Sequence, residues 1–145
     1  MNLNYLKLNP DKTELLVIDA GESQWSDLFW PPEMGPSPGP AQVVKSLGLT
    51  VDSALSMSKQ VSSVCGTCIT TVRRLRRLAP LVSTSTLRAS VQAMVISHLD
   101  YGNELYAGIS GQVLHKLQTV KNDAARPIYK VPRSAHASPL LCELH

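Results

Sequence analysis

The sequence predicts an α+β fold that is predominantly α, in which short strands come first and a three-helix bundle follows. Apolar runs of strand length with β-branched residues occur in the first 52 residues. From Ser58 onward, apolar residues recur instead at the i, i+3, i+4 spacing of amphipathic helices. Of the 145 residues, 43% are hydrophobic and only 5% aromatic, so a modest core must consist mainly of Leu, Val, Ile and Ala. We expect strands in residues 1–56, helices in residues 57–130 and an extended tail in residues 131–145.

Two strands are expected in the first part. The first is Thr13–Ile18, after a turn at Asn9–Asp11 whose central proline restricts its predecessor to extended conformations. The second is Val43–Asp52, with Gly48 marking a bend. Residues 19–42 contain five prolines, and such a stretch can neither sustain a helix nor pair within a sheet. We therefore expect a long loop between the two strands.

The first helix is expected to run from Ser58 to Pro80, where the proline ends it. Arg73, Arg74 and Arg77 fall on its polar side, and Arg76 falls at the edge. The apolar stripe opposite consists of Val61, Val64, Cys65, Cys68, Val72, Leu75 and Ala79.

Two more helices are expected, the second after a Ser/Thr-rich cap region at residues 83–86 and the third after Ser110. Pro127 lies inside the third and should kink or stop it, because a proline in a helix interior costs about 3 kcal/mol. The expected buried face of the second helix consists of Leu87, Val91, Met94, Val95 and His98 or Leu99. That of the third consists of Val113, Leu114, Leu117, Val120, Ala124 and Ile128.

Charge and cysteine content limit the class of protein. A formal net charge of +3 is too small to indicate a nucleic-acid partner by itself, but four arginines between residues 73 and 77 concentrate that charge. The three cysteines are an odd set, and the first residues lack a basic region followed by an apolar run. Both features predict an intracellular chain with free thiols, in nucleus or cytoplasm. No window approaches the roughly 18–20 apolar residues of a membrane span, so we expect no membrane partner.

Five segments carry a family resemblance. Leu6–Glu14, with an Asn and a Lys-Thr pair ahead of a strand, resembles polymerase motif D in reverse transcriptases of non-LTR retrotransposons, the LINE elements of the jockey type. Val95–Gly108, which contains Leu-Asp-Tyr-x-Asn, resembles a later part of the same enzymes. The other three segments resemble the Leu-Gly strand of the primer grip, the first thumb helix running into its turn, and the last thumb helix; they are Lys45–Asp52, Arg76–Leu81 and Leu117–Arg126. The resemblance covers nearly the whole chain except about residues 19–42.

The resemblance implies a truncated enzyme: residues 1–56 would be a palm-edge remnant and residues 57–130 a thumb-like domain. The family's two-metal mechanism needs carboxylates that hold two ions about 3.5–4 Å apart, and this sequence has no Asp-Asp pair. We therefore expect no enzymatic activity from this chain alone and no cofactor, with Mg²⁺ only in an intact RNA-directed DNA polymerase. Gly102, where the family often has Cys, and Pro127, where it usually has an aliphatic residue, indicate drift without selection for polymerase activity.

Three residues acquire roles only through the resemblance. Lys12 matches the motif D lysine, which in an intact enzyme would act as a general acid on the pyrophosphate leaving group. Leu47 and Gly48 match the primer grip. Without a substrate pocket, Lys12 is equally a solvated lysine beside a turn.

The basic residues are the candidate nucleic-acid site. Arg73, Arg74, Arg77 and Arg88, with Lys116 as a neighbour, would contact the phosphates of an RNA/DNA duplex and give salt-sensitive affinity without sequence readout. The alternative is the solvated face of an amphipathic helix.

Cys65-Gly-Thr-Cys68 has the spacing of half a zinc site, but a second pair is lacking and zinc needs four ligands. Both cysteines fall on the predicted buried stripe, so we expect core packing and no metal. Cys142 and the four histidines, His98, His115, His136 and His145, would complete a site only by coincidence.

Other polar and aromatic residues are expected to have structural roles. His98 should be a core histidine, and Trp25 and Trp30 should dock over the strands instead of stacking on bases. Asp100, Tyr101 and Asn103 should form hydrogen bonds at a helix end.

Two functions remain open at this point. The first is a degenerate piece of a retrotransposon polymerase with at most weak primer–template binding. The second is a domesticated, non-enzymatic helical module that binds proteins. A domesticated module should keep its helices intact, so Pro127 and the proline-rich stretch favour the first.

Overall fold

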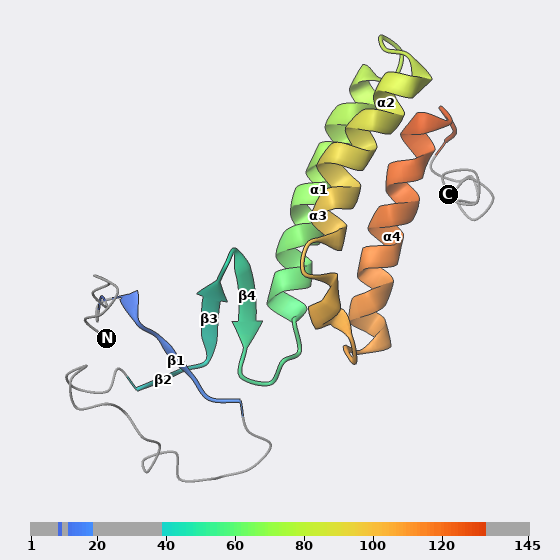
Figure 1. Ribbon diagram of the computed structural model, residues 1–145. Coiled ribbons are helices and arrows are strands. Elements are labelled where there is room, and N and C mark those ends of the chain that lie inside the picture. Colours follow the sequence, from blue (N-terminus) through green and yellow to red (C-terminus); the bar gives the residue numbers. More distant parts are fainter. Residues whose placement is uncertain (1–8, 10–11, 19–38, 133–145) are drawn as a thin grey trace. The chain divides into compact units, whose positions relative to one another are not determined.

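The computed structural model describes residue 9, residues 12–18 and residues 39–132, and the fold within them is α+β and predominantly α (Figure 1). The chain divides into two units, Met1–Ser56 and Met57–His145. The first contains short strands and the second contains helices, and each is described by itself.

The first unit contains a β-hairpin. Strands β3 (Val43–Ser46) and β4 (Leu49–Asp52) are antiparallel, with Val43 opposite Asp52 and Ser46 opposite Leu49. The turn residues Leu47 and Gly48 have φ angles of 50° and 82°, as a two-residue type I′ turn requires. The prediction of one strand over residues 43–52 is therefore wrong. Gly48 marks a complete reversal of the chain instead of a bend, because it tolerates positive φ.

The first unit also contains a short parallel pair, β1 (Leu15–Leu16) and β2 (Pro40–Ala41). The predicted strand at Thr13–Ile18 is thus reduced to two residues. The expectation that the proline-rich stretch cannot pair within a sheet is wrong at its end. A proline is compatible with the first position of an edge strand. Such a strand has a neighbouring strand on one side only, so the missing N–H of the proline breaks no hydrogen bond on the other side.

Helix α1 (Ser58–Leu78) is the longest helix and lies where the apolar spacing predicts it. Its stripe is buried along the bundle, from Val61 through Cys68 to Leu75, although Val64 is only half-buried. The helix ends just before Pro80, whose ring would clash with the carbonyl one turn earlier. Before the helix, Met57 adopts a left-handed conformation with φ 55° and is itself almost fully buried.

The second helix consists of three continuous pieces: α2 (Thr84–Val91), the π-helical turn η5 (Gln92–Ile96) and α3 (Ser97–Asp100). Ser83 caps its start, accepting a hydrogen bond of 3.1 Å from the Thr86 N–H. Within η5, the Ser97 N–H donates to the Gln92 carbonyl, an i→i+5 bond.

The π turn explains which side chains of this helix are buried. The buried residues are four apart: Leu87, Val91, Val95 and Leu99. In a regular α-helix a spacing of four drifts by about 40° per step. The wider π turn compensates for that drift, so all four stay on one face. Met94, which we expected on the buried face, is exposed instead; of the alternatives His98 and Leu99, Leu99 is buried and His98 is exposed.

Helix α4 (Gly111–Ile128) begins after Ser110 and contains Pro127 in its last turn. It ends with the two bonds of a Schellman motif, Lys130 N–H to the Pro127 carbonyl and Val131 N–H to the Arg126 carbonyl, both 3.2 Å. The helix thus continues through Pro127 and ends where Lys130 adopts a left-handed conformation with φ 53°. Leu114, expected on the buried face, is exposed.

The core of the second unit lies where α1, α4 and the α2–η5–α3 helix pack together as a bundle. Among the described residues it is mostly aliphatic, with Tyr106 of the short 3₁₀ helix η6 (Asn103–Tyr106) at one end. None of the helices in the described part of the chain combines the length and apolarity needed to cross a membrane. The largest fully buried side chains are Met57, Val61, Cys68, Leu87, Val95 and Ile128.

Replacing two glycines by alanine should shift stability in opposite directions. At Gly48 the positive φ makes any Cβ unfavourable, so Gly48→Ala should destabilise the hairpin by roughly 1 kcal/mol. Gly66 is exposed inside α1, where an added Cβ meets no atom within 4 Å. Gly66→Ala should therefore stabilise the bundle by about 1 kcal/mol. Amide exchange of β3–β4 and urea unfolding followed by circular dichroism measure the two effects, and a shift of the same sign at both positions would contradict the assignment.

The capping role of Ser83 can be tested against a matched serine. Ser83→Ala should lower the free energy of unfolding by about 1 kcal/mol, because the Thr86 N–H loses its acceptor. Ser110 occupies the same N-cap position on α4, but its side chain forms no capping hydrogen bond, so Ser110→Ala should cost less. Equal losses in urea unfolding would mean that the Ser83 bond contributes nothing.

Candidate functional site

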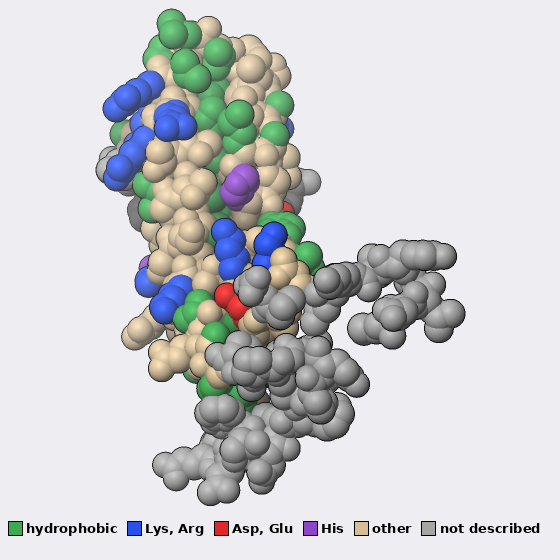
Figure 2. Space-filling model, turned by 90° about the vertical axis from the view of Figure 1, so that its left-hand side faces the viewer, with side chains coloured by type: hydrophobic (Ala, Val, Ile, Leu, Met, Phe, Trp, Pro, Cys, Tyr) green, Lys and Arg blue, Asp and Glu red, His purple; other side chains and the backbone are tan. Residues whose placement is uncertain are grey.

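The basic face of α1, which we define as Arg73, Arg74 and Arg77, is exposed along its whole length. Since Cys68, Val72 and Leu75 bury the other side of the helix, the guanidinium groups extend away from the core. Figure 2 shows one face of the molecule, on which Lys and Arg side chains gather beside exposed hydrophobic ones.

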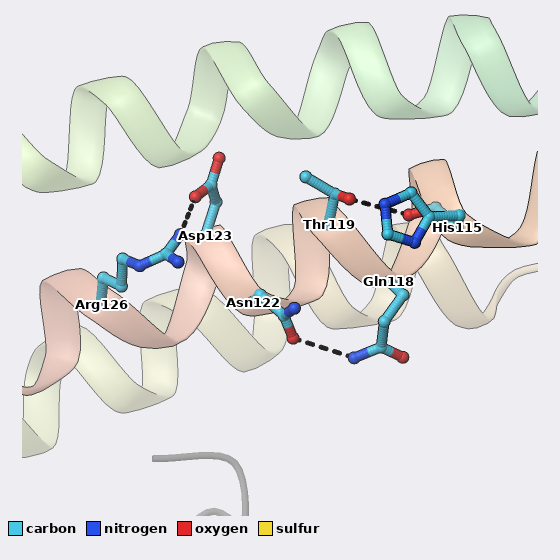
Figure 3. Close-up of polar contacts among 6 residues, drawn as sticks. All are labelled: His115, Gln118, Thr119, Asn122, Asp123 and Arg126. Atoms are coloured by element: carbon cyan, nitrogen blue, oxygen red, sulfur yellow. Dashed lines mark hydrogen bonds and ion pairs between the residues drawn. The ribbon is translucent and has the colours of Figure 1, made fainter. Parts of the chain in front are cut away.

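Nothing in the described part of the chain neutralises this basic face. Arg73, Arg74 and Arg77 have no ion-pair partner among the described residues. On α4, by contrast, Arg126 forms an ion pair with Asp123, which lies three residues earlier in the same helix (Figure 3). The α1 arginines thus keep their charge available for an external anion.

Several polar residues of α4 form hydrogen bonds within their own helix. The Gln118 amide donates to the Asn122 side chain at 2.9 Å, and the Thr119 hydroxyl donates to the His115 carbonyl at 2.8 Å (Figure 3). These contacts, like the ion pair, join residues three or four apart, which is the spacing of neighbours on a helix surface. This face of α4 is therefore stabilised locally and offers no concentrated charge.

The structure does not bring every predicted basic residue together. Arg88 lines a hollow between the second helix and α4, together with Asp100 and Lys121. Arg74 lies instead in a groove between α1 and the second helix. Lys116 lies near Cys65, where its positive charge acts on the thiol. Arg88 and Lys116 are thus separate from the basic face of α1.

A groove between α1 and the second helix was not expected from the sequence. We call it the Met94 groove, and it has a volume of about 540 Å³. The sequence signal that would have revealed it is the four-residue spacing of the apolar residues in the second helix. When those residues occupy the core, Met94 faces outward. Its lining residues are Thr67, Thr71, Arg74, Leu75, Leu78, Ser90, Ala93, Met94 and His98.

The residues named through the resemblance lie in the first unit. Lys12 is exposed beside a turn, in which its N–H donates to the Asn9 carbonyl at 3.2 Å. Leu47 and Gly48 form the tip of the β3–β4 hairpin, and Leu47 is 87% exposed. The hairpin therefore presents a large apolar side chain to its surroundings at the expected primer-grip position.

Both cysteines of α1 are buried and free. Burial raises the pKa of Cys65, although the charge of Lys116 lowers it in part. Burial, with a smaller contribution from Cys65, raises the pKa of Cys68 to about 11. The Cys68 thiol donates to the Val95 carbonyl at 3.8 Å. The raised pKa values keep both thiols protonated at neutral pH, the form in which cysteine packs as a small apolar side chain.

No group of three His, Cys, Asp or Glu side chains able to hold a metal ion occurs among the described residues. Cys142, His136 and His145, as well as Trp25 and Trp30, lie outside the described residues.

The segment that ends the second helix has a structural explanation. The Tyr101 N–H donates to the Ser97 carbonyl at 3.1 Å, and Gly102 follows with φ 73°. A left-handed residue at this place reverses the chain into η6, which favours glycine. Asp100, Tyr101 and Asn103 are exposed around that turn, and His98 is exposed instead of being a core histidine, because the π turn rotates it out.

In comparisons with known proteins, no family model matches the chain, and no curated protein or solved structure matches it either.

The raised pKa of Cys68 makes stability depend on pH. Below pH 9 the thiol is protonated in both states and has no effect. Between pH 9 and about 11 the unfolded chain releases the proton while the folded chain keeps it, so the free energy of unfolding should fall. In Cys68→Ala the decline should be shallower, as measured by urea unfolding at several pH values. An unchanged slope would show that Cys68 is not responsible.

Proposed function

We propose that this chain derives from the palm edge and thumb of a LINE-type reverse transcriptase, and that it binds the backbone of nucleic acid weakly without catalysing polymerisation. The observation behind the proposal is the basic face of α1, with three exposed arginines and no ion-pair partner among the described residues. Phosphates are the anions that such a face suits, because arginine donates several hydrogen bonds in a fixed planar arrangement.

The spacing of the arginines supports contact with an extended polyanion. Arg73 and Arg77 are four residues apart, about 6 Å along the helix, and Arg74 lies between them on the adjacent side. Three cations arranged over one helical turn can contact successive phosphates without reading bases. The affinity should therefore be salt-sensitive and independent of sequence.

The same residues also have a structural role. Arg77 lies in the last turn of α1, where a cation interacts favourably with the helix dipole by roughly 0.3–1 kcal/mol. A variant of the basic face must therefore be shown to be folded before its binding is interpreted.

The binding test uses the full chain, fluorescence anisotropy and a labelled RNA–DNA primer–template over a range of salt concentrations. The wild type should bind more weakly as salt rises. Combined replacement of Arg73, Arg74 and Arg77 by Ala should reduce the slope of log K against log salt by up to about 3. Circular dichroism confirms that the variant keeps its helices.

A matched control removes the same amount of charge elsewhere: Lys45→Ala, Lys59→Ala and Lys121→Ala together. These lysines lie off the basic face, on β3, at the start of α1 and on α4. The control variant should keep most of the wild-type affinity. Equal losses of affinity in the two variants would show that binding depends on net charge and not on the basic face. Absence of binding by the folded wild type at low salt would refute the proposal.

A further inference from the structure

The Met94 groove combines exposed apolar side chains with an opening between two helices. Met94 is 55% exposed and Leu78 is 48% exposed, and both line the groove. Just beyond the end of α1, Leu81 is 79% exposed, and its N–H donates to the Leu78 carbonyl. Met94 and Leu78 therefore give the groove an exposed apolar part, a feature that marks interaction surfaces when it is contiguous.

The π turn explains why Met94 is part of this groove. It holds Val95 and Leu99 in the core and thereby places Met94 and His98 at the groove. Single π-helical turns are rare and frequently occur at functional sites. Methionine suits a binding surface, because its unbranched, polarisable side chain adapts to the shape of a partner.

The charges around the groove indicate the kind of partner. Arg74 and His98 are the ionisable residues among those that line it, and no Asp or Glu is among them. The hollow beside α4 differs, because it contains Asp100 together with Arg88 and Lys121. An occupant of the Met94 groove should therefore present apolar side chains flanked by carboxylates.

The dimensions of the groove match a short helix. It extends along α1 from Thr67 to Leu78, about 16 Å at 1.5 Å per residue. A partner helix of about three turns spans that length and places apolar side chains at i, i+3 or i+4, and i+7 into the groove. Its hydroxyl lining, Thr67, Thr71 and Ser90, tolerates a polar edge of such a helix.

We propose that the Met94 groove binds an acidic amphipathic helix of another protein, with apolar side chains seated against Met94 and Leu78 and carboxylates facing Arg74 and His98. This site shares Arg74 with the basic face of α1, whereas Met94, Leu78 and His98 lie outside that face. The three-helix bundle acts here as a receptor, and the partner supplies the fourth helix.

The probe is a labelled synthetic peptide of about 15 residues, with Leu at helical spacing on one face and Glu on the other. Titration of the full chain should give saturable binding, with NMR shift changes at the residues of the Met94 groove. Met94→Glu should weaken binding at least about tenfold, because a carboxylate then replaces the apolar contact and repels the peptide. Arg74→Ala should weaken it less, and a peptide with Lys in place of Glu should bind poorly.

Leu114→Glu is the matched control, because Leu114 is also helical and is 54% exposed but lies on α4, away from the groove. It should leave peptide affinity unchanged. No binding to folded protein, or equal losses with Met94→Glu and Leu114→Glu, would overturn the proposal.

If Met94→Glu abolished binding of the RNA–DNA duplex while the peptide failed to bind, the groove would belong to nucleic acid instead. If the peptide proposal held and the duplex did not bind, only the proposed function would fail.

Discussion

Burial of the α1 stripe against the two other helices is the contact on which the helical unit depends. Val61 and Cys68 are fully buried, and Val72 and Leu75 nearly so, while α1 contributes the central surface to both neighbours. A core with so few aromatic residues must gain its stability from many close aliphatic contacts. This explains why even the two cysteines are part of the core, where each behaves as a small apolar side chain.

The same constraint determines the surface. Once Leu87 and Val91 are fixed in the core, the next apolar positions, Val95 and Leu99, reach it only through a π turn. The turn moves Met94 outward, next to Leu78 and Arg74 of α1. A requirement of internal packing therefore gives the Met94 groove its combination of apolar and basic side chains.

The long helices were predictable, because their apolar periodicity is repeated over many turns, with Pro80 just after α1 and Ser110 just before α4. The fold class and the positions of α1 and α4 follow from that pattern. The hairpin was missed because the pattern of residues 43–52 fits one continuous strand as well as two short strands joined by a turn. The turn is also difficult to recognise, because Leu47 is an unusual residue at positive φ. The exposure of Met94 and His98 was missed because an ideal period of 3.6 assigns them to the core, and a single i→i+5 bond changes that assignment.

The candidate site shows the same limit. Sequence reasoning found the exposed arginines of α1, because charge opposite an apolar stripe must face solvent. It also grouped Arg88 with them, but the two helices turn Arg74 and Arg88 toward different grooves. Which helix faces meet is a property of tertiary packing, and a single sequence contains no direct record of it.

The π turn also has the character of a one-residue insertion absorbed by the helix. If one residue between 92 and 96 were removed, the core positions would follow Leu87 at intervals of four, seven and eleven, the spacing of a regular α-helix. The buried face would survive such a deletion almost unchanged, whereas the outer face of the turn would present one residue fewer. An insertion or deletion at this point would thus change which side chains the second helix exposes without changing which ones it buries. The surface can therefore diverge faster than the core.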